Sequence, residues 1–261
     1  MMSTKRILVL IGIGLLAAAC AVPPPPVAGQ PPVIAQARAE STPLKAAKLI
    51  IEHNATDADT GFQGFVDSEG WKNLTFTGPG GEALSLTGQG ALSNLGLTEL
   101  FFETVEPANA DVPLAEMLAL LPEGEYTIGG EAIESGEAKG YTSGVAWLTH
   151  QIPAGPALLS PAEDAVVSAS DDLLVSWTPV TTTISGGEVT IIAYQLIIER
   201  SEQAYPHMIG KIGLSIYFPA SVTSIAIPSE FLTPGTSYNW EVLAIEESGN
   251  QTLSFSTFRT E

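Results

Sequence analysis

Apolar residues at every second position are the feature that most restricts the fold of this chain. From residue 157 onward such runs are short and are separated by turn-forming residues. In a β-strand, alternate side chains point to opposite faces, so each run gives a strand with one apolar face. Several such strands in succession predict two antiparallel sheets packed face to face, a β-sandwich. The residues predicted to form the apolar faces are Leu173, Val175, Trp177, Tyr194, Leu196, Ile198, Ile225, Ile227, Tyr238, Trp240, Val242, Ala244, Leu253 and Phe255.

A set of aromatic, proline and glycine residues in the same region follows a known pattern. The set comprises Pro161, Trp177, Tyr194, Leu232, Pro234, Gly235 and Tyr238. With these residues, the region 157–261 resembles a fibronectin type III domain. The resemblance implies that Trp177, Tyr194 and Tyr238 belong to the core. It also implies a tyrosine corner, in which the phenol of Tyr238 reaches back to a nearby backbone group. The segment 201–213 departs from the family because it is long and irregular for a strand connection.

The preceding region, residues 44–155, is also predicted to be mostly β, with short apolar runs broken by Gly, Asp and Asn. The exception is a short helix between Asp111 and Leu121, with Asp111 as its cap and Pro113 in its first turn. Its apolar face would comprise Leu114, Met117, Leu118 and Leu121. Leu121, Pro122, Gly124 and Tyr126 then repeat the pattern around Tyr238. This repeat favours a second, divergent immunoglobulin-like sandwich, and a jelly-roll-like pair of sheets is the alternative. A short proline-containing linker, residues 153–163, would join the two domains.

The first 43 residues predict export and membrane attachment. Lys5 and Arg6 precede a run of 13 apolar residues and glycines, which is too short for a bilayer span but suits a signal peptide. The run ends at Cys20 and resembles the lipobox of bacterial lipoproteins, with Ala17 where Leu is usual. The resemblance implies a signal peptide over 1–19 and lipidation of Cys20, with the outer membrane favoured if the cell has one. Residues 20–43 would then form a proline-rich tether.

Composition restricts the partners and the chemistry. Lys and Arg number 10 against 29 Asp and Glu, a formal net charge of −19, which repels nucleic acid. The single cysteine excludes an internal disulfide, and the three histidines, His53, His150 and His207, lie in separate segments without paired spacing. Motifs for nucleophilic catalysis or phosphate binding are missing, and carboxylates are too numerous for a catalytic pair to be singled out. We therefore predict a protein that is not an enzyme and that needs no cofactor other than, at most, calcium.

The segment 52–69 offers the candidate metal ligands. Asp57 and Asp59 are two residues apart, with Asn54 before them and Asp67 after them. Oxygen atoms arranged in this way suit calcium, although Ser68 occupies the position where a helix-loop-helix calcium site needs Glu. One interpretation is a calcium-bound loop that stiffens the first domain. The other, which we favour, is an acidic surface turn, because short pairs of acids are common in turns.

Three aromatic residues next to this segment raise the question of sugar binding. Phe62, Phe65 and Trp71 would favour a carbohydrate-binding face if they were exposed, and otherwise they belong to the core. Three functions therefore remain open. The favoured one is a non-catalytic envelope lipoprotein whose sandwiches bind an extracytoplasmic protein or mediate adhesion. The alternatives are a calcium-dependent or polysaccharide-binding module and a hydrolase in the first domain, which converging acids with a raised pKa would support.

Overall fold

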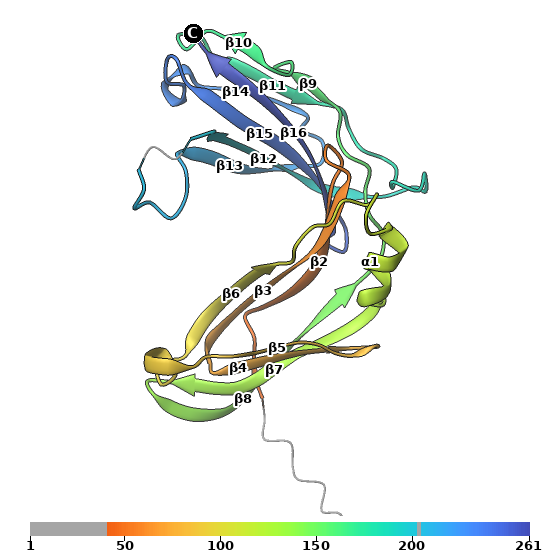
Figure 1. The fold of residues 1–261 in the computed structure, drawn as a ribbon, viewed down its shortest axis with the longest axis vertical. Coiled ribbons are helices and arrows are strands. Elements are labelled where there is room, and N and C mark those ends of the chain that lie inside the picture. The colour runs from red at the N-terminus through yellow and green to blue at the C-terminus, as the bar shows by residue number, and fades with distance from the viewer. Residues whose placement is uncertain (1–40, 203–204) are drawn as a thin grey trace, which may run out of the picture. The chain divides into compact units, whose positions relative to one another are not determined.

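Figure 1 shows the computed structural model, which describes residues 41–202 and 205–261. Cys20, the predicted signal peptide and most of the predicted tether lie outside the described residues. Residues 39–261 form one compact unit that contains both hydrophobic cores and every described strand. This part of the chain therefore has the contacts it needs to fold without residues 1–38. Among the described residues, none of the helices is long and apolar enough to cross a membrane.

The region after residue 157 folds into the predicted sandwich. One sheet has the order β14-β11-β9, and the facing sheet contains β16-β15-β12-β13, with β10 parallel to β16. A division of three strands against four is that of a fibronectin type III-like sandwich. The strands are β9 (Leu158–Ser160), β10 (Ala165–Val167), β11 (Leu173–Trp177), β12 (Ile191–Arg200), β13 (Gly213–Pro219), β14 (Ser224–Ile227), β15 (Ser237–Glu246) and β16 (Gln251–Thr260), and the short helix η2 (Ser229–Phe231) precedes β15.

The aromatic residues of this sandwich lie where the resemblance placed them. Trp177, Tyr194 and Tyr238 are each at most 1% exposed, and the rings of Trp177 and Tyr194 pack edge to face at 5.6 Å. The backbone N–H of Thr233 donates to the hydroxyl of Tyr238 at 2.9 Å, which confirms the tyrosine corner. A buried N–H that loses its acceptor costs about 1–3 kcal/mol, so this bond fixes the entry into β15.

The predicted core face of β16 is wrong. Phe258 supplies the contact of this strand with the core, and its neighbours on the inner face are the small polar residues Ser256 and Thr260. Leu253 and Phe255 lie on the opposite face of the strand, because side chains alternate. The apolar pattern indicated the outer face because Leu253 is an apolar residue that is buried on that face. It is buried there because β16 pairs at this point with a strand of the first half.

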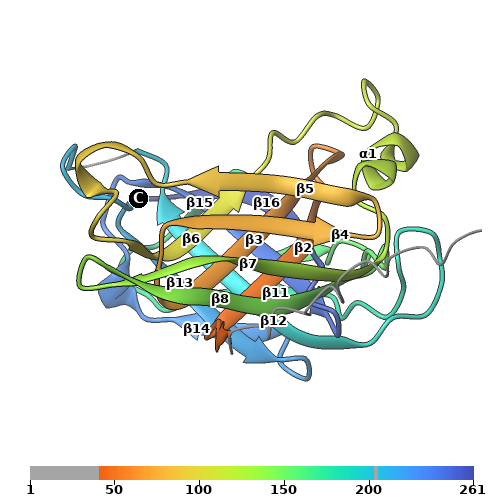
Figure 2. The same cartoon turned by 90° about the horizontal axis from the view of Figure 1, so that it is seen from below.

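The first half is a sandwich with the same strand order. Its sheets are β6-β3-β2 and β5-β4-β7-β8, so that three strands again face four, with β1 added parallel to β8. Figure 2 shows the four-stranded layer crossing in front of β3 and β2. This repeat agrees with the immunoglobulin-like alternative. The elements are β1 (Thr42–Pro43), β2 (Ala46–Asn54), β3 (Asp59–Trp71), β4 (Asn73–Gly78), β5 (Gly81–Thr87), η1 (Gly90–Leu92), β6 (Leu97–Glu103), α1 (Leu114–Leu120), β7 (Gly124–Glu134) and β8 (Glu137–Leu148).

The helix and the second tyrosine corner are close to what the sequence predicts. Met117 is buried, and its apolar neighbours on α1 pack against the core of the first half. The hydroxyl of Tyr126 donates to the carbonyl of Pro122 at 2.9 Å. The predicted cap is wrong: Pro113 occupies the N-cap position, and Asp111 instead lies in a turn where its N–H donates to Ala108.

The two sandwiches share a sheet, which the sequence does not predict. Residues 52–54 of β2 pair in parallel with residues 251–253 of β16, so β6-β3-β2 continues into β16-β15-β12-β13. Asn250, which is 1% exposed, holds this seam together. Its Oδ1 accepts from the N–H of Ile51 at 2.8 Å, and its Nδ2 donates to the carbonyls of Thr149 at 2.9 Å and Gln151 at 3.0 Å.

We expect Asn250→Ala to lower the free energy of unfolding by about 2–4 kcal/mol, because it leaves several buried polar groups without partners. Urea denaturation followed by tryptophan fluorescence measures this change. Asn94→Ala, at an exposed asparagine far from the seam in the sequence, is the control and should change the free energy by less than about 0.5 kcal/mol. Equal stability of the two variants would show that Asn250 does not hold the seam.

Candidate functional site

The outer face of the shared sheet carries a groove of about 630 Å³. Its lining comes from both sandwiches, from strands β2, β3 and β6 of the first and from β12, β13, β15 and β16 of the second. The volume lies within the range of small-molecule and peptide sites, about 300–1,000 Å³. The groove therefore exists only because the seam places the two sandwiches edge to edge.

Exposed apolar side chains form part of this lining. Phe101 is 62% exposed on β6 and Tyr217 is 64% exposed on β13, so one lies on each terminal strand of the shared sheet. Phe65 and Ile192 lie between them and are 36% and 51% exposed. Large apolar groups gathered on one open face indicate a surface that is covered when a ligand binds.

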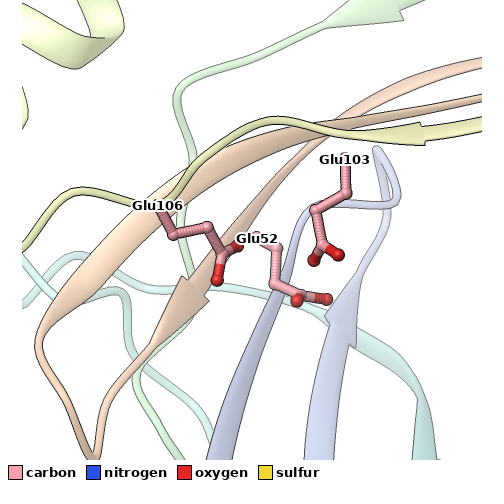
Figure 3. A group of neighbouring side chains, drawn as sticks. All are labelled: Glu52, Glu103 and Glu106. Carbon is pink, nitrogen blue, oxygen red and sulfur yellow. The ribbon is translucent and has the colours of Figure 1, made fainter.

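Carboxylates form the other part of the site. Glu52, Glu103 and Glu106 each place an oxygen atom within 4.8 Å of the others, and Figure 3 shows their side chains converging. Two amides of neighbouring strands support them. Gln251 Nε2 donates to Glu52 Oε2, and Gln63 Nε2 donates to Glu103 Oε1 at 3.0 Å. Carboxylates this close repel one another, so at least one of them is favoured in its neutral form.

Glu106 is the member of this cluster with the least support. Its Oε1 is shielded from solvent and has no hydrogen-bond partner among the described residues. Burial, followed by the charges of Glu52, Glu103 and Asp59, raises its pKa to about 7. A glycine makes room for it, because a Cβ on Gly61 would lie 2.7 Å from Glu106 Cγ. Glu106 is therefore partly protonated at neutral pH.

Glu241, a carboxyl that lines the groove itself, behaves in the same way. Burial, followed by the charges of Glu52, Glu199 and Glu103, raises the pKa of Glu241 to about 7. Burial also raises the pKa of Glu52, against the opposing effect of its bond from Gln251. Lys48 is the one cationic side chain among the residues that line the groove. The groove thus has excess acid and is stabilised by protons or by a cationic ligand.

The predicted calcium ligands are only partly brought together. Asn54, Asp57 and Asp59 share the turn between β2 and β3, where Asn54 Oδ1 accepts from the N–H groups of Thr56 and Asp57 at 2.9 and 3.1 Å. Asp67 lies toward the other end of the hairpin, opposite Ala46 in the register. The amide oxygen of Asn54 is thus already used by the turn. Calcium binding here stays a prediction, with Asp57 and Asp59 as its available carboxylates.

The three aromatic residues singled out in the sequence separate into two groups. Phe62 and Trp71 are 3% and 2% exposed and belong to the core of the first half, whereas Phe65 points into the groove. The acids of the groove were not singled out in the sequence. Each occupies an outward position next to core residues, as Glu52 follows Ile51, but such positions are common on any half-buried sheet. Their convergence depends on the seam, for which the sequence contains no local signal.

Comparisons with known proteins return fibronectin type III modules at low similarity. No protein-family model matches the sequence. The FN1–FN3 domains of chicken CNTN1 are 12% identical, with coverage of 84% of this chain and 65% of that one and a TM-score of 0.29. A two-domain fibronectin type III segment of chicken tenascin is 13% identical, with coverage of 83% and 98% and a TM-score of 0.28. The fibronectin(III)-like modules of Clostridium thermocellum CbhA are 11% identical, with coverage of 83% and 93% and a TM-score of 0.30.

The fibronectin type III-like fold of the second half rests on the strand order, the tyrosine corner and the buried Trp177 of this chain itself.

The raised pKa values of Glu106 and Glu241 predict a stability that depends on pH. A carboxyl whose pKa rises from 4.5 to about 7 on folding stabilises the folded state fully below pH 4.5, and this stabilisation is lost as the pH rises through about 7. We expect the melting temperature at pH 8 to lie below that at pH 5. Each glutamine substitution at these positions should reduce this difference in melting temperature. The reduction should be about 2–4 °C for each kcal/mol of pH-dependent stability that the substitution removes.

Calorimetric melting of residues 39–261 at the two pH values measures this effect for Glu106→Gln and Glu241→Gln. Glu125→Gln, at an exposed glutamate of β7 outside the groove, is the control for the loss of one charge. A pH dependence that is equal in all three variants and the wild type would contradict the assignment.

Proposed function

We propose that the chain is a non-catalytic, lipid-anchored protein of the bacterial cell envelope that binds a partner protein in the groove of the shared sheet. The observation that carries the proposal is the groove itself, in which exposed Phe101 and Tyr217 stand at its two sides around a set of carboxylates. The lipobox-like sequence before Cys20 and the proline-rich stretch after it support the envelope location.

The lining indicates the chemistry of the partner. The apolar side chains favour aromatic or aliphatic groups, and the excess of carboxylates over Lys48 favours Lys or Arg. An arginine can make a bidentate contact with a carboxylate, and such contacts rank among the stronger ones in interfaces. The ligand is therefore a segment of protein in which basic and apolar side chains alternate.

The edges of the shared sheet indicate how such a segment could bind. Among the described strands, β6 pairs only with β3, and β13 pairs only with β12. Each terminal strand therefore offers backbone groups to an added strand, while its groove-lining aromatic residue faces the same ligand. A strand added at either edge would present alternate side chains to the groove.

Panning of a random linear peptide library on immobilised residues 39–261 tests the proposal. We expect enrichment of peptides that combine Lys or Arg with apolar residues, and binding that weakens as ionic strength rises. The affinity of a selected peptide, measured by fluorescence anisotropy, should fall by at least roughly tenfold in a Phe101→Ser, Tyr217→Ser double variant.

Trp147→Ser is the matched control, because Trp147 is 61% exposed on β8, outside the groove. Its affinity for the selected peptide should equal that of the wild type. Peptides without basic residues, or equal binding to the double variant, would contradict the proposal.

Hydrolysis is the second candidate, favoured by the converging acids and by the pKa values of about 7 for Glu106 and Glu241. A glycosidase would release sugar from polysaccharide in a reaction that Glu106→Gln or Glu241→Gln abolishes. We expect no release, because the carboxylates lie on an open face beside exposed apolar groups. Reducing-sugar release that is lost in either variant would replace the binding proposal.

The calcium alternative makes a separate prediction. Calcium bound at the turn between β2 and β3 would raise the melting temperature, and the increase would be lost in an Asp57→Ala, Asp59→Ala double variant. Calorimetric titration of calcium with and without chelator distinguishes this alternative from an acidic turn, for which neither heat nor a melting shift is expected.

A further inference from the structure

A second cavity lies inside the first sandwich, between its two sheets. It measures about 560 Å³ and reaches the core, where Leu49, Phe62 and Phe76 are each at most 3% exposed. Its walls include Leu84 of β5 and Phe102 of β6, and Leu120 of α1 lies at its border with 66% of its surface exposed. The cavity is therefore a preformed apolar pocket of the size that small ligands occupy.

The sheet topology explains why this pocket exists. Among the strands that the structure describes, β5 pairs only with β4 and β6 pairs only with β3, so these two strands are the edges of opposite sheets on the same side of the sandwich. No backbone hydrogen bonds join them, and the layer between the sheets opens there. Side chains fill it only partly, since Leu84 and Phe102 remain half-buried.

Aromatic packing keeps the pocket from closing. The ring of Phe102 packs edge to face on Phe76 at 5.6 Å. The same ring occupies the space over Gly64, where a Cβ would lie 2.2 Å from it. Because Gly64 and Phe76 together hold this ring, Phe102 cannot turn into the cavity without losing both contacts. An apolar occupant would remove the apolar surface of this pocket from water, which is favourable.

The polar groups at the pocket restrict the head group of that occupant. Glu82, Glu103 and Thr104 are the polar residues among the described lining, which includes no Lys, Arg or His. The carboxylate of Glu103 lies on the groove face, where it accepts from Gln63, so Glu82 is the acid that faces this pocket. A carboxylate or phosphate head would meet Glu82 without a compensating cation, in a chain whose formal net charge is −19. An ammonium head would instead be attracted to the carboxylate of Glu82.

We propose that this pocket binds a single-chain amphiphile with a cationic head, its apolar chain between the sheets and its head at Glu82. This site is separate from the groove of the shared sheet, with which it has only Glu103 in common. The inference does not depend on the function proposed above, and Phe101→Ser, Tyr217→Ser should leave it intact.

Displacement of the neutral fluorophore N-phenyl-1-naphthylamine from residues 39–261 tests the proposal with three ligands of equal chain length. Below their micellar concentrations, decyltrimethylammonium should displace the fluorophore best, decanol less well, and decanoate at least roughly tenfold less well than the cation. Ala83→Trp, at an exposed position of the lining, should block the pocket and abolish displaceable fluorescence.

Charge variants distinguish an effect of the acid at the pocket from an effect of the overall negative charge of the chain. Glu82→Lys should remove the preference for the cation and improve displacement by decanoate. Glu125→Lys makes the same change of net charge on β7, away from the lining, and should preserve the order of the three ligands. Equal effects of the two lysine variants would overturn the proposal. It would also be overturned if the wild type gave no displaceable fluorescence, or if Ala83→Trp bound as the wild type does with an unchanged melting temperature.

Discussion

The shared sheet and its groove depend on the parallel pairing of residues 52–54 with residues 251–253, which comprises three residue pairs. Parallel pairing normally requires a long connection between the strands, and here that connection is almost the whole of both sandwiches. The pairing alone is short. Asn250 reinforces it through side-chain bonds to backbone groups on either side, in a region where an unpaired polar group would be costly.

The groove opposes this stability. Carboxylates gathered on one face repel one another and lose hydration. The raised pKa values of Glu106 and Glu241 and the amide bonds from Gln63 and Gln251 reduce this cost. Arrangements that cost stability without improving the packing are typical of surfaces that recognise a ligand. The exposed Phe101 and Tyr217 add to this cost, because neither contributes to a core while the groove is open.

The sequence predicts what depends on local pattern. Alternation around Trp240 and the proline-glycine turn before Tyr238 give the second sandwich, and their weaker repeat around Tyr126 gives the first, together with its helix. Prediction from the sequence fails where polar residues are buried, as at Thr260 on the inner face of β16. Small hydroxyl residues can be buried without giving an apolar pattern. The groove could not be predicted for another reason. Glu52 and Glu241 act together only through the seam, and Ile51 and Asn250 are 199 residues apart in the chain.

That separation has a consequence for biosynthesis. The first sandwich contains all of its own strands and can fold as soon as β8 is available, because domains fold as units in the order of synthesis. The groove cannot form at that time, since one of its central strands is β16, the last strand described. A nascent chain that pauses between the two sandwiches therefore has the core of the first sandwich but no groove, and the edge of β2 at residues 52–54 is still unpaired. The presence of the groove thus reports that translation has gone through both modules.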